Sequence, residues 1–286
     1  MLPIARQLSE QQGVPYVYDT HELAVHEYAH RWLWLMFQRP LVAAVEREGI
    51  TGAALSSCVS SGIADFLQSY HGLPQRPMVV RNLPRYEAHP FRPCGEMIEV
   101  LYHGVVSPGR GLEACIESVA SWQPGFRLTI RGPASESYRT ELLGRAKAAR
   151  VADRVLLAPP VPMVDLVREA ARFDIGLFAL PDHSRQNNLA LPNKFFEYMM
   201  AGLALCISDL PEMSALLRHY DLGRLIPAVT PDAIAAAINA FDRAAVGHYK
   251  VRALEAARTL NWETEGELYF HAVAEALRGN RGSFPR

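Results

Sequence analysis

The sequence predicts an α/β protein whose larger part is a doubly wound parallel sheet, because short apolar runs alternate with amphipathic stretches from about residue 98 onward. Several runs are rich in Val, Ile and Leu without polar alternation, which is typical of strands covered on both faces. The expected strands are 98–103, 126–131, 154–158, 174–179, 204–208 and 222–226. The expected helices are 111–121, 136–150, 162–172, 193–202, 211–219, 231–245, 249–259 and 262–279. Ligands of such sheets bind beyond the carboxyl ends of the strands, so we expect a site there.

A shorter and weaker version of the same rhythm precedes residue 85. Its expected elements are helices 2–12, 24–49 and 61–70 and strands 14–19, 52–59 and 78–80. Residues 84–96 contain three prolines and a glycine, which indicates a linker. We therefore expect a partial N-terminal domain at 1–85, a complete sheet domain at 86–260 and a final helix at 261–286.

Composition narrows the function classes. The 286 residues are 49% hydrophobic and 21% charged, which is typical of a globular protein with a sizeable core. The net charge of -1 does not favour nucleic-acid binding. Four scattered cysteines without a CxxC pair do not favour a zinc or disulfide framework. No apolar run reaches transmembrane length and no signal peptide is recognisable, so we expect a cytoplasmic protein.

The most informative segment is 191–208, which is typical of a loop, a short helix, a glycine stop and a buried strand. Pro192 and Asn193 are suited to a helix start, where backbone amides and the helix dipole favour an anion. Lys194 adds a positive charge, and Glu197 lies one turn further on the same face. This layout predicts a sugar-nucleotide site, with phosphate at the helix start and sugar hydroxyls at Glu197. The plainer interpretation is a capped surface helix with an i,i+3 ion pair.

A second candidate is the loop 104–111, which follows an expected strand and precedes an expected helix. Gly104 allows phosphate to approach the backbone, and Arg110 supplies charge-assisted hydrogen bonds. Alone, such a loop is a common strand-to-helix turn.

Two histidines also follow expected strands. His21 and Glu22 come after strand 14–19, where catalytic groups gather in open α/β sheets, and a histidine there is suited to bind a hydroxyl or relay a proton. His103 ends the strand 98–103 and faces the same expected cleft. The plainer interpretation is a helix-capping surface residue for His21 and a structural residue for His103.

Residues 31–37 form an aromatic-rich segment flanked by arginines. It is suited to a membrane surface or a lipid-linked acceptor. Core packing of a helix is the more common explanation.

The sequence Asn-Lys-Phe-Phe-Glu-Tyr-Met-Met-Ala-Gly-Leu at 193–203, followed by a buried strand and 208–211, resembles the donor-site signature of family-4 glycosyltransferases. These are retaining enzymes with two Rossmann-like domains, the GT-B fold. The resemblance continues through 18–22, 80–84, 102–104, 110–112, 130–132, 154–155, 174–177 and 261–263. It implies a complete C-terminal donor domain, a partial N-terminal acceptor-side domain and a final helix that crosses back to brace the latter.

The resemblance also implies residue roles. Glu197 would bind the donor ribose hydroxyls, Arg110 the diphosphate, and Lys194 with the amides around Asn193 the diphosphate or sugar. His21 would face the sugar near its anomeric centre.

The chain departs from the family pattern at two positions. Leu189 stands where a first acidic residue is usual, and Val105 stands where an arginine usually follows Gly104. Arg131 or Lys194 would then supply the missing phosphate contact.

The implied activity is that of a hexosyltransferase that uses a UDP- or GDP-sugar as donor substrate, with no tightly bound cofactor and no metal. The implied acceptor is a glycan, a lipid-linked sugar or a small molecule, with peripheral contact at the inner face of the membrane. The N-terminal region is short for a domain, so a homodimer or a missing N-terminal partner is also expected. Two alternatives stay open: a non-catalytic nucleotide-sugar-binding protein and a GT-B sugar-nucleotide epimerase.

Overall fold

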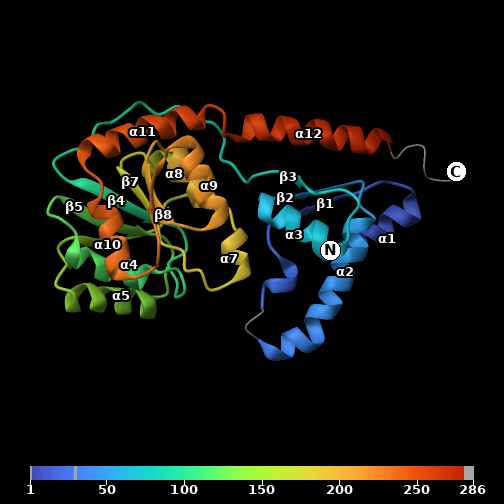
Figure 1. Cartoon of the computed structure of the whole chain (residues 1–286), viewed down its shortest axis with the longest axis horizontal. Coiled ribbons are helices and arrows are strands. Elements are labelled where there is room, and N and C mark those ends of the chain that lie inside the picture. Colours follow the sequence, from blue (N-terminus) through green and yellow to red (C-terminus); the bar gives the residue numbers. More distant parts are fainter. Residues whose placement is uncertain (1, 29–30, 280–286) are drawn as a thin grey trace. The chain divides into compact units, whose positions relative to one another are not determined.

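The computed structural model describes residues 2–28 and 31–279, which fall into two units (Figure 1). Unit 1 takes its described residues from Met1–Asn82, Ser184–Leu191 and Trp262–Arg286. Unit 2 consists of Leu83–His183 and Pro192–Asn261. The units are therefore not contiguous in sequence, because a short internal segment and the last helix belong with the N-terminal part.

Unit 2 contains a parallel six-stranded sheet of order β6-β5-β4-β7-β8-β9, which confirms the predicted doubly wound α/β class. The strands are β4 (Ile98–His103), β5 (Phe126–Arg131), β6 (Val155–Ala158), β7 (Ile175–Phe178), β8 (Ala204–Ser208) and β9 (Gly223–Ile226). The order of the strands reverses between β4 and β7. This reversal is the topological switch point, where the carboxyl ends of the two strands open a crevice.

Helices flank both faces of this sheet (Figure 1). The helices of unit 2 are α4 (Leu112–Ser118), α5 (Glu136–Ala148), α6 (Leu166–Ala170), α8 (Asn193–Met200), α9 (Pro211–Tyr220), α10 (Pro231–Asn239) and α11 (Arg243–Ala257). Contacts join α4 with α5 and α10, and α8 with α6 and α11. Two helical layers result, as right-handed crossovers running outward in both directions from the switch point require.

The break between two helices of unit 2 was predicted at the wrong place. The expected helix 231–245 ends at Asn239, and the expected helix 249–259 is α11, which begins at Arg243. The Asp242 side chain caps α11 by accepting a hydrogen bond from the Ala245 amide at 2.7 Å, and Phe241 is buried at the break. Asp is a strong helix N-cap, so the helix restarts after it.

Unit 1 contains a parallel three-stranded sheet of order β1-β2-β3. Its strands are β1 (Val17–Thr20), β2 (Leu55–Cys58) and β3 (Met78–Val79), and its helices are α1 (Leu2–Gln12), α2 (Arg39–Thr51), α3 (Ser61–His71), α7 (Arg185–Leu189) and α12 (Trp262–Gly279). The core is an apolar cluster that includes Ile50, Ile63 and Leu67. Glu265 of α12 accepts a hydrogen bond from the Arg81 amide at 2.9 Å, which ties the last helix to the end of this unit's N-terminal part.

The expected helix 24–49 is interrupted. A 3₁₀ turn covers Ala24–His26, a π-helical turn covers Trp34–Gln38, and α2 follows directly; residues 29–30 of the expected helix lie outside the described residues. Pro40 occupies the first turn of α2 and has no amide hydrogen, so the backbone before it adjusts to the wider turn.

The expected core packing of 31–37 is wrong for most of the segment. Trp34 is buried, but five neighbouring side chains are exposed by more than half and form what we call the apolar surface: Trp32, Leu33, Met36, Phe37 and Leu41. Geometry explains the exposure. The helical run 34–51 is about 27 Å long at 1.5 Å per residue, whereas the four-residue strands beneath it span about 13 Å. The front half of the run therefore extends past the sheet.

Candidate functional site

The carboxyl ends of β4 and β7 form the centre of the site. Lys194, on the first turn of α8, extends over two aromatic rings, one from each strand. Its Nζ atom lies 5.6 Å from the ring centroid of Tyr102 and 5.1 Å from that of Phe178. The ammonium group is therefore held at the switch point, where doubly wound sheets bind ligands.

Gly104 makes room for this lysine. Its φ of +116° is disfavoured for other residues, and a Cβ there would lie 2.6 Å from Lys194 Cε. Burial, together with the positive charge of Arg110, lowers the pKa of Lys194 to about 8, although Glu197 acts in the opposite direction. A cation held in a desolvated place beside another cation is suited to an anionic ligand, whose charge would relieve both effects.

Arg110 lies in a tight turn before α4. The turn depends on Gly111, which has a φ of +72°. A Cβ at this position would lie 2.3 Å from the Ala179 carbonyl oxygen, so a side chain would collide with it. The turn is thereby fixed against the end of β7. Among the described residues, no hydrogen bond or ion pair engages the Arg110 guanidinium, so it remains available to a ligand.

The start of α8 differs slightly from the prediction. Pro192 is the N-cap, and Asn193 is the first helical residue, so Asn193 is not the cap. The Phe195 amide donates to the Pro192 carbonyl at 3.0 Å. The first turn of this eight-residue helix still directs its positive dipole end toward the switch point.

Glu197 follows one turn later and is 17% exposed. Its Oε2 atom lies 2.8 Å from Nε2 of the fully buried His103, at ion-pair distance but without hydrogen-bond alignment. Sequence analysis placed both residues near the cleft but did not pair them. The spacing of 94 residues gives no signal for it, because only the packing of α8 against β4 brings them together.

Arg131 ends β5 beside His103 in the sheet register. Its guanidinium lies over the Phe173 ring, 5.2 Å from the centroid, and burial lowers its pKa. Nη1 is buried without a hydrogen-bond partner in the described part of the chain. Arg131 is therefore at the correct sheet edge, while its charge is directed toward α6.

His21 and Glu22 lie in unit 1, directly after β1. The exposed His21 ring has Nε2 at 3.0 Å from Asp19 Oδ2, and Asp19 Oδ1 accepts a hydrogen bond from Ser57 Oγ at 2.6 Å. Glu22 is exposed, and its carbonyl accepts from Thr20 Oγ1 at 2.9 Å. The sequence did not single out Asp19, which contacts the His21 ring from two positions earlier, at the end of β1.

Leu189, which stands where the family pattern has an acid, is partly buried beside the core of unit 1. It packs against that unit's apolar cluster, and its carbonyl accepts a hydrogen bond from Ser60 Oγ at 2.7 Å. In the same short helix, Gln186 Oε1 accepts from the Leu23 amide at 2.7 Å. An acid at 189 would place a charge against apolar side chains, which explains the leucine.

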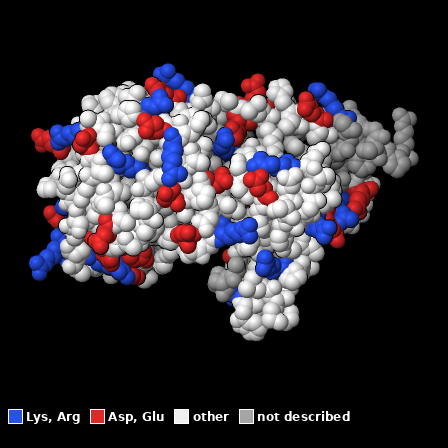
Figure 2. Space-filling view, viewed as in Figure 1, with Lys and Arg blue, Asp and Glu red and all other residues white. Residues whose placement is uncertain are grey.

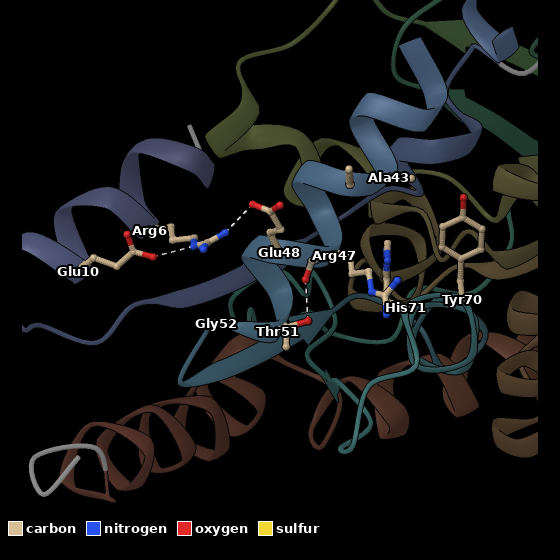
Figure 3. Close-up of a pocket in the computed structure, with 10 residues that line it drawn as sticks. Arg6, Glu10, Ala43, Arg47, Glu48, Thr51, Gly52, Tyr70 and His71 are labelled. Atoms are coloured by element: carbon tan, nitrogen blue, oxygen red, sulfur yellow. Dashed lines mark hydrogen bonds and ion pairs between the residues drawn. The ribbon is translucent and has the colours of Figure 1, made fainter. Parts of the chain in front are cut away.

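A groove of about 840 Å³ lies elsewhere in unit 1, between α1, α2 and α3 (Figure 3). It contains none of the expected site residues. In its lining, Arg6 bridges Glu10 at 2.9 Å and Glu48 at 2.5 Å. These charges are mutually satisfied, so the groove is not where the chemistry of the site is concentrated.

Residues 2–28 and 31–279 contain no group of three His, Cys, Asp or Glu side chains placed to hold a metal ion. None of the helices in this part of the chain combines the length and apolar character needed to cross a bilayer.

A doubly wound sheet with cations and a carboxylate at its switch point defines a class of α/β proteins that bind anionic ligands beyond the strand ends. Within that class, the chain belongs to the family described as group 1 glycosyl transferases, whose model matches residues 98–241, half of the chain. A comparison with curated protein sequences found no match.

Solved structures show the GT-B fold. The chain is similar to sucrose-phosphate synthase from Thermosynechococcus elongatus at 17% identity and a TM-score of 0.74, with 96% of this chain and 72% of that chain covered. It is similar to HepE from Anabaena in complex with UDP at 16% identity and a TM-score of 0.78, with 96% of this chain and 76% of that chain covered. It is also similar to WaaG, a glycosyltransferase of lipopolysaccharide biosynthesis, at 16% identity and a TM-score of 0.63, with 92% of this chain and 80% of that chain covered.

Proposed function

We propose that this protein is a retaining family-4 glycosyltransferase that moves a hexose from a nucleoside-diphosphate sugar to a hydroxyl of a glycan, a lipid-linked sugar or a small acceptor. The observation that carries the proposal is the placement of Lys194 and Glu197 on one face of α8 at the switch point. The lysine and Arg110 would neutralise the diphosphate, and Glu197 would accept hydrogen bonds from the ribose hydroxyls. HepE, a fold neighbour, has been crystallised with UDP-glucose, which supports a UDP-sugar as donor.

The acceptor side would use His21 and Glu22 of unit 1. Asp19 holds the His21 ring by Nε2, which leaves Nδ1 to contact a sugar hydroxyl. The donor site would need no metal, because the helix dipole and two basic side chains supply positive charge there.

Glu197→Ala tests the donor site by titration calorimetry with UDP-glucose and GDP-mannose. We expect the variant to lose the heat of donor binding that the unmodified protein gives. Glu212→Ala, a first-turn change on α9 in the same unit, is the control and should retain binding. Unchanged affinity in Glu197→Ala would rule out this site.

A non-catalytic nucleotide-sugar-binding protein is the second candidate, because Leu189 replaces an acid of the family pattern. Incubation with donor separates the candidates. Release of nucleoside diphosphate with glycosylated acceptor supports the transferase, binding without turnover supports the second candidate, and an altered free sugar without acceptor indicates an epimerase.

The proposal includes a peripheral contact with the inner face of the membrane through the apolar surface of unit 1. The lower end of the α2 region projects as a mostly uncharged lobe (Figure 2). Residues 28–45 contain Arg31 and Arg39 but no acidic residue. Exposed Trp, Phe, Leu and Met side chains with nearby arginines are suited to an anionic lipid surface.

A further inference from the structure

His103 is a buried titratable side chain to which the proposed function assigns no role. It closes β4 and is fully buried, yet its Nε2 atom lies 2.8 Å from Glu197 Oε2. Neither ring nitrogen has an aligned hydrogen-bond partner among the described residues, so the contact with Glu197 is one of ion-pair distance. The Glu197 carboxylate is therefore the polar group that this imidazole meets at the site, and a buried imidazole without such a partner would be costly.

The ring of His103 is held in place by Tyr198, the residue after Glu197. The two rings lie 4.6 Å apart and 31° from parallel, and the His103 amide donates to the Tyr198 hydroxyl at 3.0 Å. The Tyr198 hydroxyl donates in turn to the Leu177 carbonyl at 3.4 Å, and burial raises its pKa so that it keeps its proton. Gly176 of β7 leaves the space for the Tyr198 ring, since any side chain there would collide with it. Contacts thus run from β7 through Tyr198 to His103.

Lys194 would otherwise compete with the donor for the carboxylate. Lys194 and Glu197 are close enough that the carboxylate raises the pKa of the lysine, and Arg110 acts on the same lysine. If Glu197 turned toward Lys194, both groups would be lost to the donor. A partner at Oε2 restrains that rotation and leaves Oε1 for a ligand.

We propose that His103 is a positioning residue of the donor site: its Nε2 group, 2.8 Å from Oε2 of Glu197, donates a hydrogen bond to that oxygen once the two groups align, and this keeps the carboxylate turned to the donor hydroxyls and away from Lys194. The proposal rests on the proposed function, because it assumes that Glu197 meets the donor. It gives a reason for a fully buried histidine at the end of β4.

The first test compares two variants by calorimetry with UDP-glucose. In His103→Gln, the side-chain amide nitrogen is as many bonds from Cα as Nε2 of the histidine and keeps an N–H donor there. In His103→Phe, the side chain keeps an aromatic ring but has no hydrogen-bond donor. Hydrogen bonds to charged groups contribute enough for His103→Phe to lose about 10- to 100-fold in affinity. His103→Gln should stay within about threefold of the unmodified protein.

A matched control comes from the same unit. His248 of α11 has Nε2 at 2.6 Å from Asp221 Oδ2, with both side chains about half exposed. His248→Phe removes a histidine–carboxylate pair outside the donor site and should leave affinity unchanged. Equal losses in His103→Gln and His103→Phe, with both variants folded, would overturn the proposal, since a purely structural role predicts that result.

A second test needs neither a donor nor a folded variant at 103. In the ligand-free protein, proton–nitrogen correlation spectra should show a slowly exchanging Nε2 proton for His103, and Glu197→Ala should shift or abolish it. A missing signal, or one unchanged in Glu197→Ala, contradicts the proposal. A present signal without UDP-glucose or GDP-mannose binding means that the proposed function has failed while the positioning contact stands.

Discussion

The two units differ in where they bury titratable groups and in how much apolar surface they expose. In unit 2, buried titratable groups lie at both ends of a six-stranded sheet: His103 and Arg131 at the carboxyl ends, and Asp174 with Lys250 at the opposite end. In unit 1, Glu46 and His71 form a buried pair 2.9 Å apart behind a three-stranded sheet, while large apolar side chains are exposed.

The difference follows from sheet size. Six strands covered by two helical layers bury enough surface to hold charges at a site without water. Three short strands cannot cover the helices that pack on them. Unit 2 therefore buries charged groups at both ends of its sheet, one of them the proposed donor site, whereas unit 1 exposes its apolar surface.

The largest expected effect tests the structural charge of unit 2. Asp174 is fully buried and accepts from Lys250 Nζ at 2.9 Å, Arg92 Nη2 at 3.0 Å and the Glu99 amide at 2.9 Å. Asp174→Ala leaves the buried lysine unpaired, so the variant should lose about 3–5 kcal/mol of stability. Calorimetric unfolding measures it. Asp153→Ala, an exposed change in the same unit, should have little effect, and equal behaviour of the two variants would contradict the comparison.

A smaller loss is expected for the equivalent pair in unit 1. Glu46 accepts from the Tyr18 hydroxyl at 3.0 Å and lies beside a histidine, which becomes neutral more readily than a lysine. Glu46→Gln should cost about 1–3 kcal/mol, because one buried hydrogen bond is weakened. Glu48→Gln on the same helix is exposed and should change stability by less than about 0.5 kcal/mol. If Glu46→Gln destabilised as much as Asp174→Ala, the contrast between the units would fail.

The pH dependence of donor binding sharpens the electrostatic side of the comparison. Because burial and Arg110 lower the pKa of Lys194 to about 8, about half of these ammonium groups are deprotonated at pH 8. An anionic diphosphate favours the charged form, so binding at that pH should take up about half a proton, and affinity should fall as the pH rises further. Calorimetry in buffers of different ionisation enthalpy measures the uptake. Lys194→Arg stays charged at this pH and should show no proton uptake on donor binding. Proton uptake that persists in this variant would mean that a group other than Lys194 binds the proton.

The smallest effect on stability is expected at the apolar surface. Trp32→Ser with Phe37→Ser should change the free energy of unfolding by less than about 0.5 kcal/mol per site, because both side chains are more than half exposed. The same variant should lose most sedimentation with phosphatidylglycerol vesicles and keep its affinity for UDP-glucose. Leu268→Ser, an exposed change on α12 of the same unit, is the control. Unchanged vesicle binding in the double variant would show that the apolar surface does not contact lipid.

Much of the fold could be predicted, because the spacing of apolar residues and the local composition decide where most helices and strands form. The buried strand β8 and the helix α12 begin and end where the sequence placed them. The break at 240–242 was misplaced, because Ala-rich sequence on both sides favours helix, whereas the Asp242 cap and the burial of Phe241 decide where the chain turns. The helix α7 was not predicted, because its five polar and apolar residues show no helical period.

The sequence by itself determined the glycosyltransferase family, the parallel sheet and the residue types of the proposed donor site, since these depend on local patterns such as a glycine loop and a Lys-x-x-Glu spacing. Only the tertiary structure decided that His103 meets Glu197, that Leu189 packs against the core of unit 1, and that the 31–37 segment is mostly exposed. The physical reason is the same in each case. A local pattern sets what a segment prefers, whereas burial and pairing depend on which other segments are long enough, and close enough, to cover it.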